Sequence, residues 1–228
     1  MFTDRWKRSE TADARSHAAS AIETSAHRNS DNSASPTKRR SSGLEQFFTH
    51  IRGEENLDLL DFSGASQANI EFITSMGHRL YSEDLIATLD FAFGGPDNYG
   101  KQLDPVHQQA FLAQNLNFKT RQFDGALLWD ALEFLAPPLL PPMVDRLRDI
   151  MKPGAYMLAL FHTEERCEAV PTWHYRIANG NTLLLAPRGS RRPAQHFSNR
   201  AVEKLFQDFD NVKFFLTRDS LREVIVKR

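Results

Sequence analysis

The stretch from Leu57 to Leu85 restricts the fold of this 228-residue chain more than any other. Asn56–Phe62 is a short apolar run that ends in a turn, which is typical of a buried parallel strand. A helical pattern follows and stops at Gly77, a residue type favoured just after a helix. Arg79–Ser82 is then predicted to be a second strand. This strand–helix–strand order is that of a nucleotide-binding unit built on a parallel sheet.

Strands and helices continue to alternate down to the C-terminus. Buried strands are predicted at Phe123–Trp129 and Tyr156–Phe161, and hairpins at Tyr175–Leu185 and Val212–Val226. Helical patterns cover Asp84–Phe93, Pro105 to about Ala113, Pro142–Met151 and Asn199–Phe209. We therefore predict a doubly wound, Rossmann-like α/β fold with a mostly parallel, seven-stranded sheet and a C-terminal antiparallel β-hairpin.

Residues 1–43 differ in composition from the rest, with nine Ser, seven Ala and no Leu or Val. Such a segment buries too little apolar surface to offset its ordering entropy. We expect it to be a disordered tail, and residues 44–228 to form the folded domain. Within the tail, the basic run Lys38–Ser42 is interpreted as a solvated linker, with phosphate contact or modification as the alternative.

Overall composition excludes some classes of partner. The formal net charge is −1, so neither nucleic acid nor a membrane surface is indicated. The most apolar stretch, Leu132–Val144, contains four prolines and cannot span a membrane. A single cysteine, Cys167, allows no intramolecular disulfide, which fits a reducing, cytoplasmic setting.

Three segments carry a family resemblance. The turn Asp61–Gln67 stands where class I S-adenosylmethionine-dependent methyltransferases have Asp-x-Gly-x-Gly-x-Gly, although Ser63, Ala65 and Gln67 replace the three glycines. The thirteen residues Phe123–Leu135 resemble the family's Phe-Asp-x-Val…Asp-x-Leu-Glu-x-Leu segment, and Met151–Ala155 resembles its Leu-Lys-Pro-Gly-Gly turn. The resemblance covers about residues 44–161 and 199–228.

The resemblance implies S-adenosylmethionine as cofactor and a set of residues that bind it. In the turn, the implied contacts are Asp61, Ser63, Gly64 and Ala65. The implied acid that binds the ribose is Glu83, with Asp84 as the alternative, and the implied amide beside the adenine is Asn117 or Asn115. Trp129 is the implied aromatic residue that covers the adenine. Ser and Ala are the smallest substitutes for glycine, so they hinder close approach of a ligand rather than block it.

Two residues are candidates for chemistry on the methyl acceptor. Asp130, just after a predicted strand, is placed by the resemblance near the reacting methyl group, with helix capping as the structural alternative. His162 follows the strand Tyr156–Phe161 and has the chemistry of a general base. The spacing of the nearby acidic, Cys and His residues fits no zinc pattern, so no metal is expected.

The loop Pro187–Phe197 carries several basic side chains, which either hold an anionic substrate or keep a flexible loop soluble. We expect a methyltransferase that acts on an unidentified small or macromolecular acceptor, with a catalytically inactive scaffold or regulatory binding protein as the alternative. A nicotinamide dehydrogenase is disfavoured, because no Gly-x-Gly-x-x-Gly follows the first strand of the βαβ unit.

Overall fold

The structure, a computed structural model, describes residues 35–96, 99–164, 167–215, 217 and 219–228. Its strands are β1 (Thr37–Arg40), β2 (Asp58–Asp61), β3 (Arg79–Ser82), β4 (Phe123–Trp129), β5 (Met151–His162), β6 (Val170–Asn179), β7 (Thr182–Arg191), β8 (Asn211–Phe215) and β9 (Leu221–Lys227). Its helices are α1 (Ser42–His50), α2 (Gln67–Ser75), α3 (Leu85–Phe93), α4 (Tyr99–Gln102), α5 (Pro105–Gln114), the 3₁₀ turn η1 (Ala131–Phe134), α6 (Leu140–Ile150) and α7 (Asn199–Leu205).

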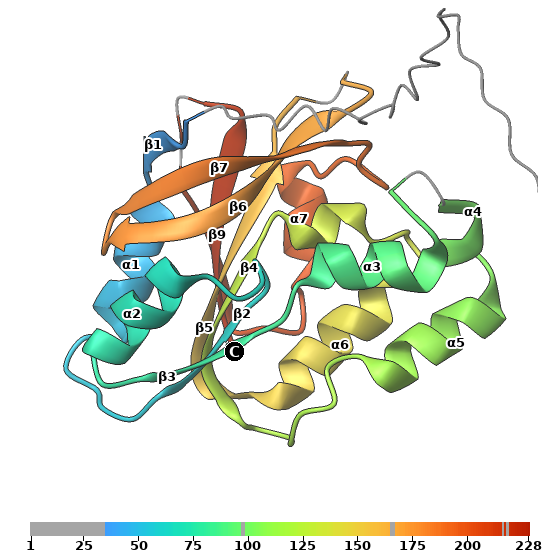
Figure 1. Cartoon of the computed structure of the whole chain (residues 1–228). Helices are drawn as coiled ribbons and strands as arrows, with labels where there is room; N and C mark the ends of the chain where they lie inside the picture. The colour runs from blue at the N-terminus through green and yellow to red at the C-terminus, as the bar shows by residue number, and fades with distance from the viewer. Residues whose placement is uncertain (1–34, 97–98, 165–166, 216, 218) are drawn as a thin grey trace, which may run out of the picture. The chain divides into compact units, whose positions relative to one another are not determined.

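The main sheet has the strand order β3-β2-β4-β5-β9-β8. The first four strands pair in parallel, whereas β9 is antiparallel to both β5 and β8. This confirms the doubly wound α/β fold and the C-terminal hairpin. Helices α1 and α2 lie on one side of the sheet, with α5 and α6 on the other (Figure 1).

The number of strands predicted for this sheet was wrong. In the described residues it has six strands instead of seven. The strands of the hairpin predicted at Tyr175–Leu185 do not join this sheet but lie in a separate one. The predicted turn Met151–Ala155 instead belongs to strand β5, at an irregularity in its pairing with β4.

A second sheet, which we call the cap sheet, has the order β1-β7-β6 and is antiparallel throughout. Its strands β6 and β7 are the predicted hairpin, extended to ten residues each. In Figure 1 these two strands cross over the end of the main sheet where the turn after β2 lies. The predicted basic loop is therefore partly strand: Arg188 and Arg191 belong to β7.

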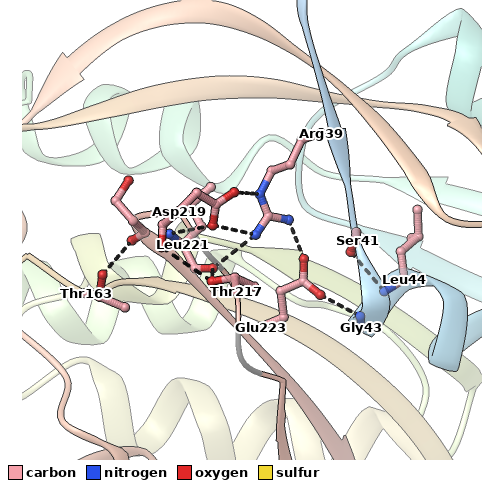
Figure 2. Close-up of polar contacts among 10 residues, drawn as sticks. Arg39, Ser41, Gly43, Leu44, Thr163, Thr217, Asp219, Leu221 and Glu223 are labelled. Carbon is pink, nitrogen blue, oxygen red and sulfur yellow. Dashed lines mark hydrogen bonds and ion pairs between the residues drawn. The ribbon is translucent and has the colours of Figure 1, made fainter.

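The boundary predicted at residue 43 was also wrong, because β1 and the start of α1 are folded. Arg39 was interpreted as part of a solvated linker, yet it is 7% exposed. Figure 2 shows its guanidinium between the carboxylates of Asp219 and Glu223, and the Glu223 carboxylate also accepts from the backbone N–H of Gly43. Ser41, fully buried, caps α1 through the N–H of Leu44. Residues 1–34 of the predicted tail lie outside the described residues.

The core lies between the main sheet and its helices. Gly125 on β4 allows the closest approach: a Cβ there would lie within 3 Å of Phe47 on α1 and of Leu59 on β2. Any larger residue at this position would force helix and sheet apart. None of the described helices is both long and apolar enough to cross a membrane.

Candidate functional site

The parallel strands deliver the predicted site residues to one edge of the main sheet. Asp61 is the last residue of β2, Trp129 the last of β4 and His162 the last of β5, and all three are buried. Because these strands run in the same direction, their carboxyl ends meet where ligands bind in open α/β sheets. The fold therefore brings together residues that lie about a hundred positions apart in the sequence.

The turn after β2 uses its one glycine at an unexpected position. Gly64, at a spacer of the family pattern, has φ of +82°, and its N–H donates to the carbonyl of Glu83 at 3.2 Å. A Cβ at this position would lie 3.2 Å from the Asp84 side chain. Ser63 and Ala65 have no positive φ, so a side chain is compatible with their backbone. The turn keeps its shape without the family's three glycines.

Asp61 is fully buried and tightly hydrogen-bonded. Its Oδ1 accepts from Ser63 N–H at 2.9 Å, from Ser63 Oγ at 2.8 Å and from Trp129 Nε1 at 2.6 Å. Its Oδ2 accepts from Asn69 Nδ2 at 2.8 Å. Burial raises the pKa of Asp61, and these hydrogen bonds oppose the rise. The Asp61 carboxylate therefore accepts its hydrogen bonds from groups of the protein itself.

Two residues that sequence reasoning missed fasten the cap sheet to this edge. The ring of Tyr175 on β6 stacks on Trp129, with centroids 4.8 Å apart and the planes 1° from parallel. Asn69 on α2 donates to the carbonyl of Tyr175 at 2.9 Å and accepts from the N–H of Ile177 at 2.7 Å. Alternation along β6 points to an inward Tyr175, but it does not identify the surface that the ring covers.

A cavity of about 540 Å³ opens beside the turn. One wall is the turn and the start of α2, and the other is β6: Ser63, Ala65, Ser66, Gln67 and Ala68, with His174, Tyr175 and Arg176 opposite. Its size is in the range of small-molecule pockets. Ser66 is the N-cap of α2 but makes no side-chain capping bond to the first N–H groups of the helix, whose first residues, Gln67 and Ala68, line this space.

The two alternatives for the ribose-binding acid have different surroundings. Asp84 caps α3 through the N–H of Ala87 at 2.9 Å and is paired with Arg188 at 2.8 Å. The side chain of Glu83 is exposed, while its backbone N–H donates to the carbonyl of Asp61 at 2.8 Å. Of these two acids, Glu83 is therefore the one with an exposed carboxylate next to the turn.

Side chains of two other predicted site segments make hydrogen bonds within the protein. Asn115 donates to the Phe111 carbonyl and Asn117 to the Ala113 carbonyl, so both amides satisfy the last turn of α5. Arg191, proposed as part of a flexible basic loop, is 4% exposed and donates to Asp90 at 2.5 Å. With the Arg188–Asp84 pair, it attaches β7 to α3.

The predicted catalytic candidates lie in a buried polar cluster. Asp130 is 1% exposed, and burial, with the nearby Glu133 charge, raises its pKa to about 7 although His162 opposes the rise. Glu133 pairs with His162: the Nδ1 to Oε2 distance is 2.6 Å. Burial lowers the pKa of His162, but the hydrogen bond to Glu133 and the charges around it outweigh this and raise it.

Glu133 is a third residue of this sheet edge that sequence reasoning did not single out. The resemblance covered it as a family-like position, but only the fold brings it to His162 from 29 residues away. Among the described residues, no three His, Cys, Asp or Glu side chains gather as a metal site.

No protein-family model matches this chain, and no curated protein matches its sequence. Solved structures similar to it include an S-adenosylmethionine-dependent methyltransferase from Methanosarcina mazei, with TM-score 0.47 and 14% identity over 79% of this chain and 96% of that one. Another is the Burkholderia thailandensis 1,6-didemethyltoxoflavin-N1-methyltransferase, with TM-score 0.47 and 12% identity over 82% of this chain and 76% of that one. An S-adenosylmethionine-dependent methyltransferase from Archaeoglobus fulgidus has TM-score 0.46 and 13% identity over 81% of this chain and 91% of that one. The likeness is distant and concerns the fold alone.

Proposed function

We propose that this chain binds S-adenosylmethionine beside the turn after β2 and transfers the cofactor's methyl group to an unidentified acceptor. The observation that carries the proposal is the 540 Å³ cavity lined by the left-handed turn, the start of α2 and the facing strand β6. This is the edge at which open α/β sheets bind ligands.

The residues around the cavity fit such a cofactor. Its methionine part carries a carboxylate, which suits the N–H groups at the start of α2 and the guanidinium of Arg176 in the opposite wall. Glu83 does not line the cavity, but its exposed carboxylate follows β3 next to the turn and suits the ribose hydroxyls. When bound, S-adenosylmethionine supplies an activated methyl group; the protein's part is to hold and orient the groups that meet it.

A second function, a non-catalytic scaffold, is favoured by one specific observation. The Asp61 carboxylate accepts four hydrogen bonds from the protein itself, and Tyr175 stacks on Trp129 directly beside it. Under this alternative the cap sheet permanently closes the edge, and the cavity beside it binds no nucleoside.

Calorimetric titration with S-adenosylmethionine and with its demethylated product separates the two. We expect both to bind, and Glu83→Ala to weaken binding by about tenfold to a hundredfold, because a hydrogen bond to a charged group contributes roughly 1.5–3 kcal/mol. Glu203→Ala, which removes an exposed carboxylate from α7, is the matched control and should bind like the parent.

Absence of heat and of any thermal shift with either ligand at millimolar concentration would favour the scaffold. Equal affinity of the parent and Glu83→Ala would reject the role of Glu83 while leaving cofactor binding in place. Ser63→Gly is expected to bind within a few-fold of the parent, because Gly64 already supplies the left-handed residue of the turn.

A further inference from the structure

A second, smaller cavity lies where the last turn of α1 meets the main sheet. Its volume is about 270 Å³. The polar part of its lining comes from α1, β5, β8 and β9: Gln46, His50, Tyr156, Asn211, Lys213 and Lys227. None of these residues lines the cavity beside the turn after β2, so the two cavities are separate sites.

The register of the main sheet places the strand residues of this cavity on one face. Tyr156 pairs with Lys227, and Lys227 pairs with Asn211, so these three form a row across β5, β9 and β8. Lys213 is two residues beyond Asn211 on β8 and therefore points to the same side of the sheet. The ring of His50 stacks on Tyr156, with centroids 3.7 Å apart and the planes 4° from parallel.

The two lysines bring positive charge to the cavity that no carboxylate of the described residues neutralises by an ion pair. Lys213 Nζ donates to Gln46 Oε1 at 3.4 Å, and Lys227 Nζ lies 5.8 Å from the centre of the Tyr156 ring. The C-terminal end of α1 contributes only about half a negative charge, which is less than the charge of one lysine. A hollow lined by charges of one sign attracts an ion of the opposite sign.

Gln46 connects Lys213 to His50. While its Oε1 accepts from Lys213, its Nε2 lies 3.1 Å from His50 Nε2. An amide nitrogen only donates, so His50 Nε2 accepts and the ring is neutral. Burial, followed by the charges of Lys213 and Lys227, lowers the pKa of His50, which agrees with a neutral ring. The protonation of His50 therefore depends on the charge in the cavity.

We propose that this cavity is a binding site for one phosphate group, either free phosphate or the phosphate of a small molecule. A phosphate ester carries about −1.5 to −2 charges at pH 7, which two lysines balance. Its terminal oxygens accept hydrogen bonds, for which Lys213, Lys227 and the Asn211 amide supply donors. The volume is below the roughly 300–1,000 Å³ of most small-molecule pockets, so it suits a phosphate group with few further atoms.

Nuclear magnetic resonance of the full-length protein tests the proposal, with the Cε1–H signal of His50 as reporter. Its loss in His50→Gln assigns the signal. We expect inorganic phosphate to shift it saturably and to raise the His50 pKa, because a bound dianion offsets the two lysines. Sodium chloride at equal ionic strength only screens these charges and should give a smaller effect without saturation.

Equal effects of the two salts would overturn the proposal. The lysines would then serve only to keep β8, which lies at the edge of the main sheet, from pairing with another chain.

Two variants remove one charge each. Lys213→Gln and Lys227→Gln should each weaken phosphate binding by about tenfold, because each removes a charge-assisted hydrogen bond. Lys204→Gln, which removes an exposed lysine from α7, is the matched control and should bind phosphate like the parent. Affinities of Lys213→Gln and Lys227→Gln equal to that of the parent would also overturn the proposal.

Phenyl phosphate distinguishes the two sources of the phosphate group. Tighter binding than that of inorganic phosphate would assign the site to a phosphorylated small molecule, and weaker binding would assign it to free phosphate. None of these measurements uses S-adenosylmethionine, and the two cavities share no lining residue. Failure of phosphate binding therefore leaves the proposed function standing, and failure of cofactor binding leaves the phosphate site standing.

Discussion

Replacing Arg39 by methionine is expected to lower the free energy of unfolding by about 3–5 kcal/mol. The Arg39 guanidinium donates to the carboxylates of Asp219 and Glu223, and its Nη2 also donates to the Leu221 carbonyl at 3.0 Å. Glu223 is fully buried, so without the guanidinium its charge would be left without a counter-ion. Urea unfolding followed by circular dichroism measures the loss.

The neighbouring residue provides a matched control. The Arg40 side chain is 76% exposed and lies 3.7 Å from Glu45, so Arg40→Met should change stability by no more than about 0.5 kcal/mol. A double variant, Arg39→Met with Glu223→Leu, should recover much of the loss, because an apolar pair of similar volume can replace a buried ion pair. Similar losses from Arg39→Met and Arg40→Met would contradict the account given for Arg39.

The same network explains why the N-terminal boundary could not be predicted from the sequence. Local composition around Arg39 is polar and basic, and it resembles the segment that precedes it. The partners of Arg39 lie 180 and 184 positions further along the chain. Only the pairing of β1 with β7 in the cap sheet and the packing of α1 on the main sheet bring them together, and no periodicity in the sequence encodes these contacts.

The part of the candidate site that lies at the ends of the parallel strands could be predicted from the sequence. Asp61, Trp129 and His162 each follow an apolar run, and the apolar runs identified the parallel strands. Asn69 and Tyr175 were not predictable, because their roles depend on how a hairpin between β5 and α7 docks on the sheet edge. Glu83, at the end of a strand and next to the turn, was predicted from spacing, and its part in binding stays a prediction.

The second large effect expected is a change in the pH dependence of the unfolding free energy in the variant Asp130→Asn. The pKa of Asp130 rises from its ordinary 3.8 to about 7 in the folded protein, mainly because burial disfavours its charge. Between these two values the folded state binds a proton that the unfolded state has lost, so this group makes stability fall as pH rises. At 1.36 kcal/mol per pKa unit, the full effect is about 4 kcal/mol.

Asp130→Asn removes this titration, because the amide carries no charge at any of these pH values. The difference in unfolding free energy, variant minus parent, should therefore grow by about 4 kcal/mol from pH 4 to pH 8, with most of the change complete near pH 7. Asp61, whose pKa is also raised, titrates in both proteins and largely cancels in the difference. His162 does not cancel fully, because the Asp130 charge helps to raise its pKa and is absent in the variant. Urea titrations across this range measure it.

Asp104→Asn provides the opposite sign as a control. The hydrogen bond from His107 lowers the pKa of the exposed Asp104, so its contribution to stability is present at neutral pH and is lost as pH falls. The difference for that variant should decrease as pH rises through the acidic range below about pH 5 and stay flat from there to pH 8, whereas that for Asp130→Asn increases across pH 5 to 7. If the Asp130→Asn difference stays flat from pH 4 to pH 8, the Asp130 carboxyl is not held protonated in the folded protein, and the cluster with His162 and Tyr175 is more hydrated than its burial indicates.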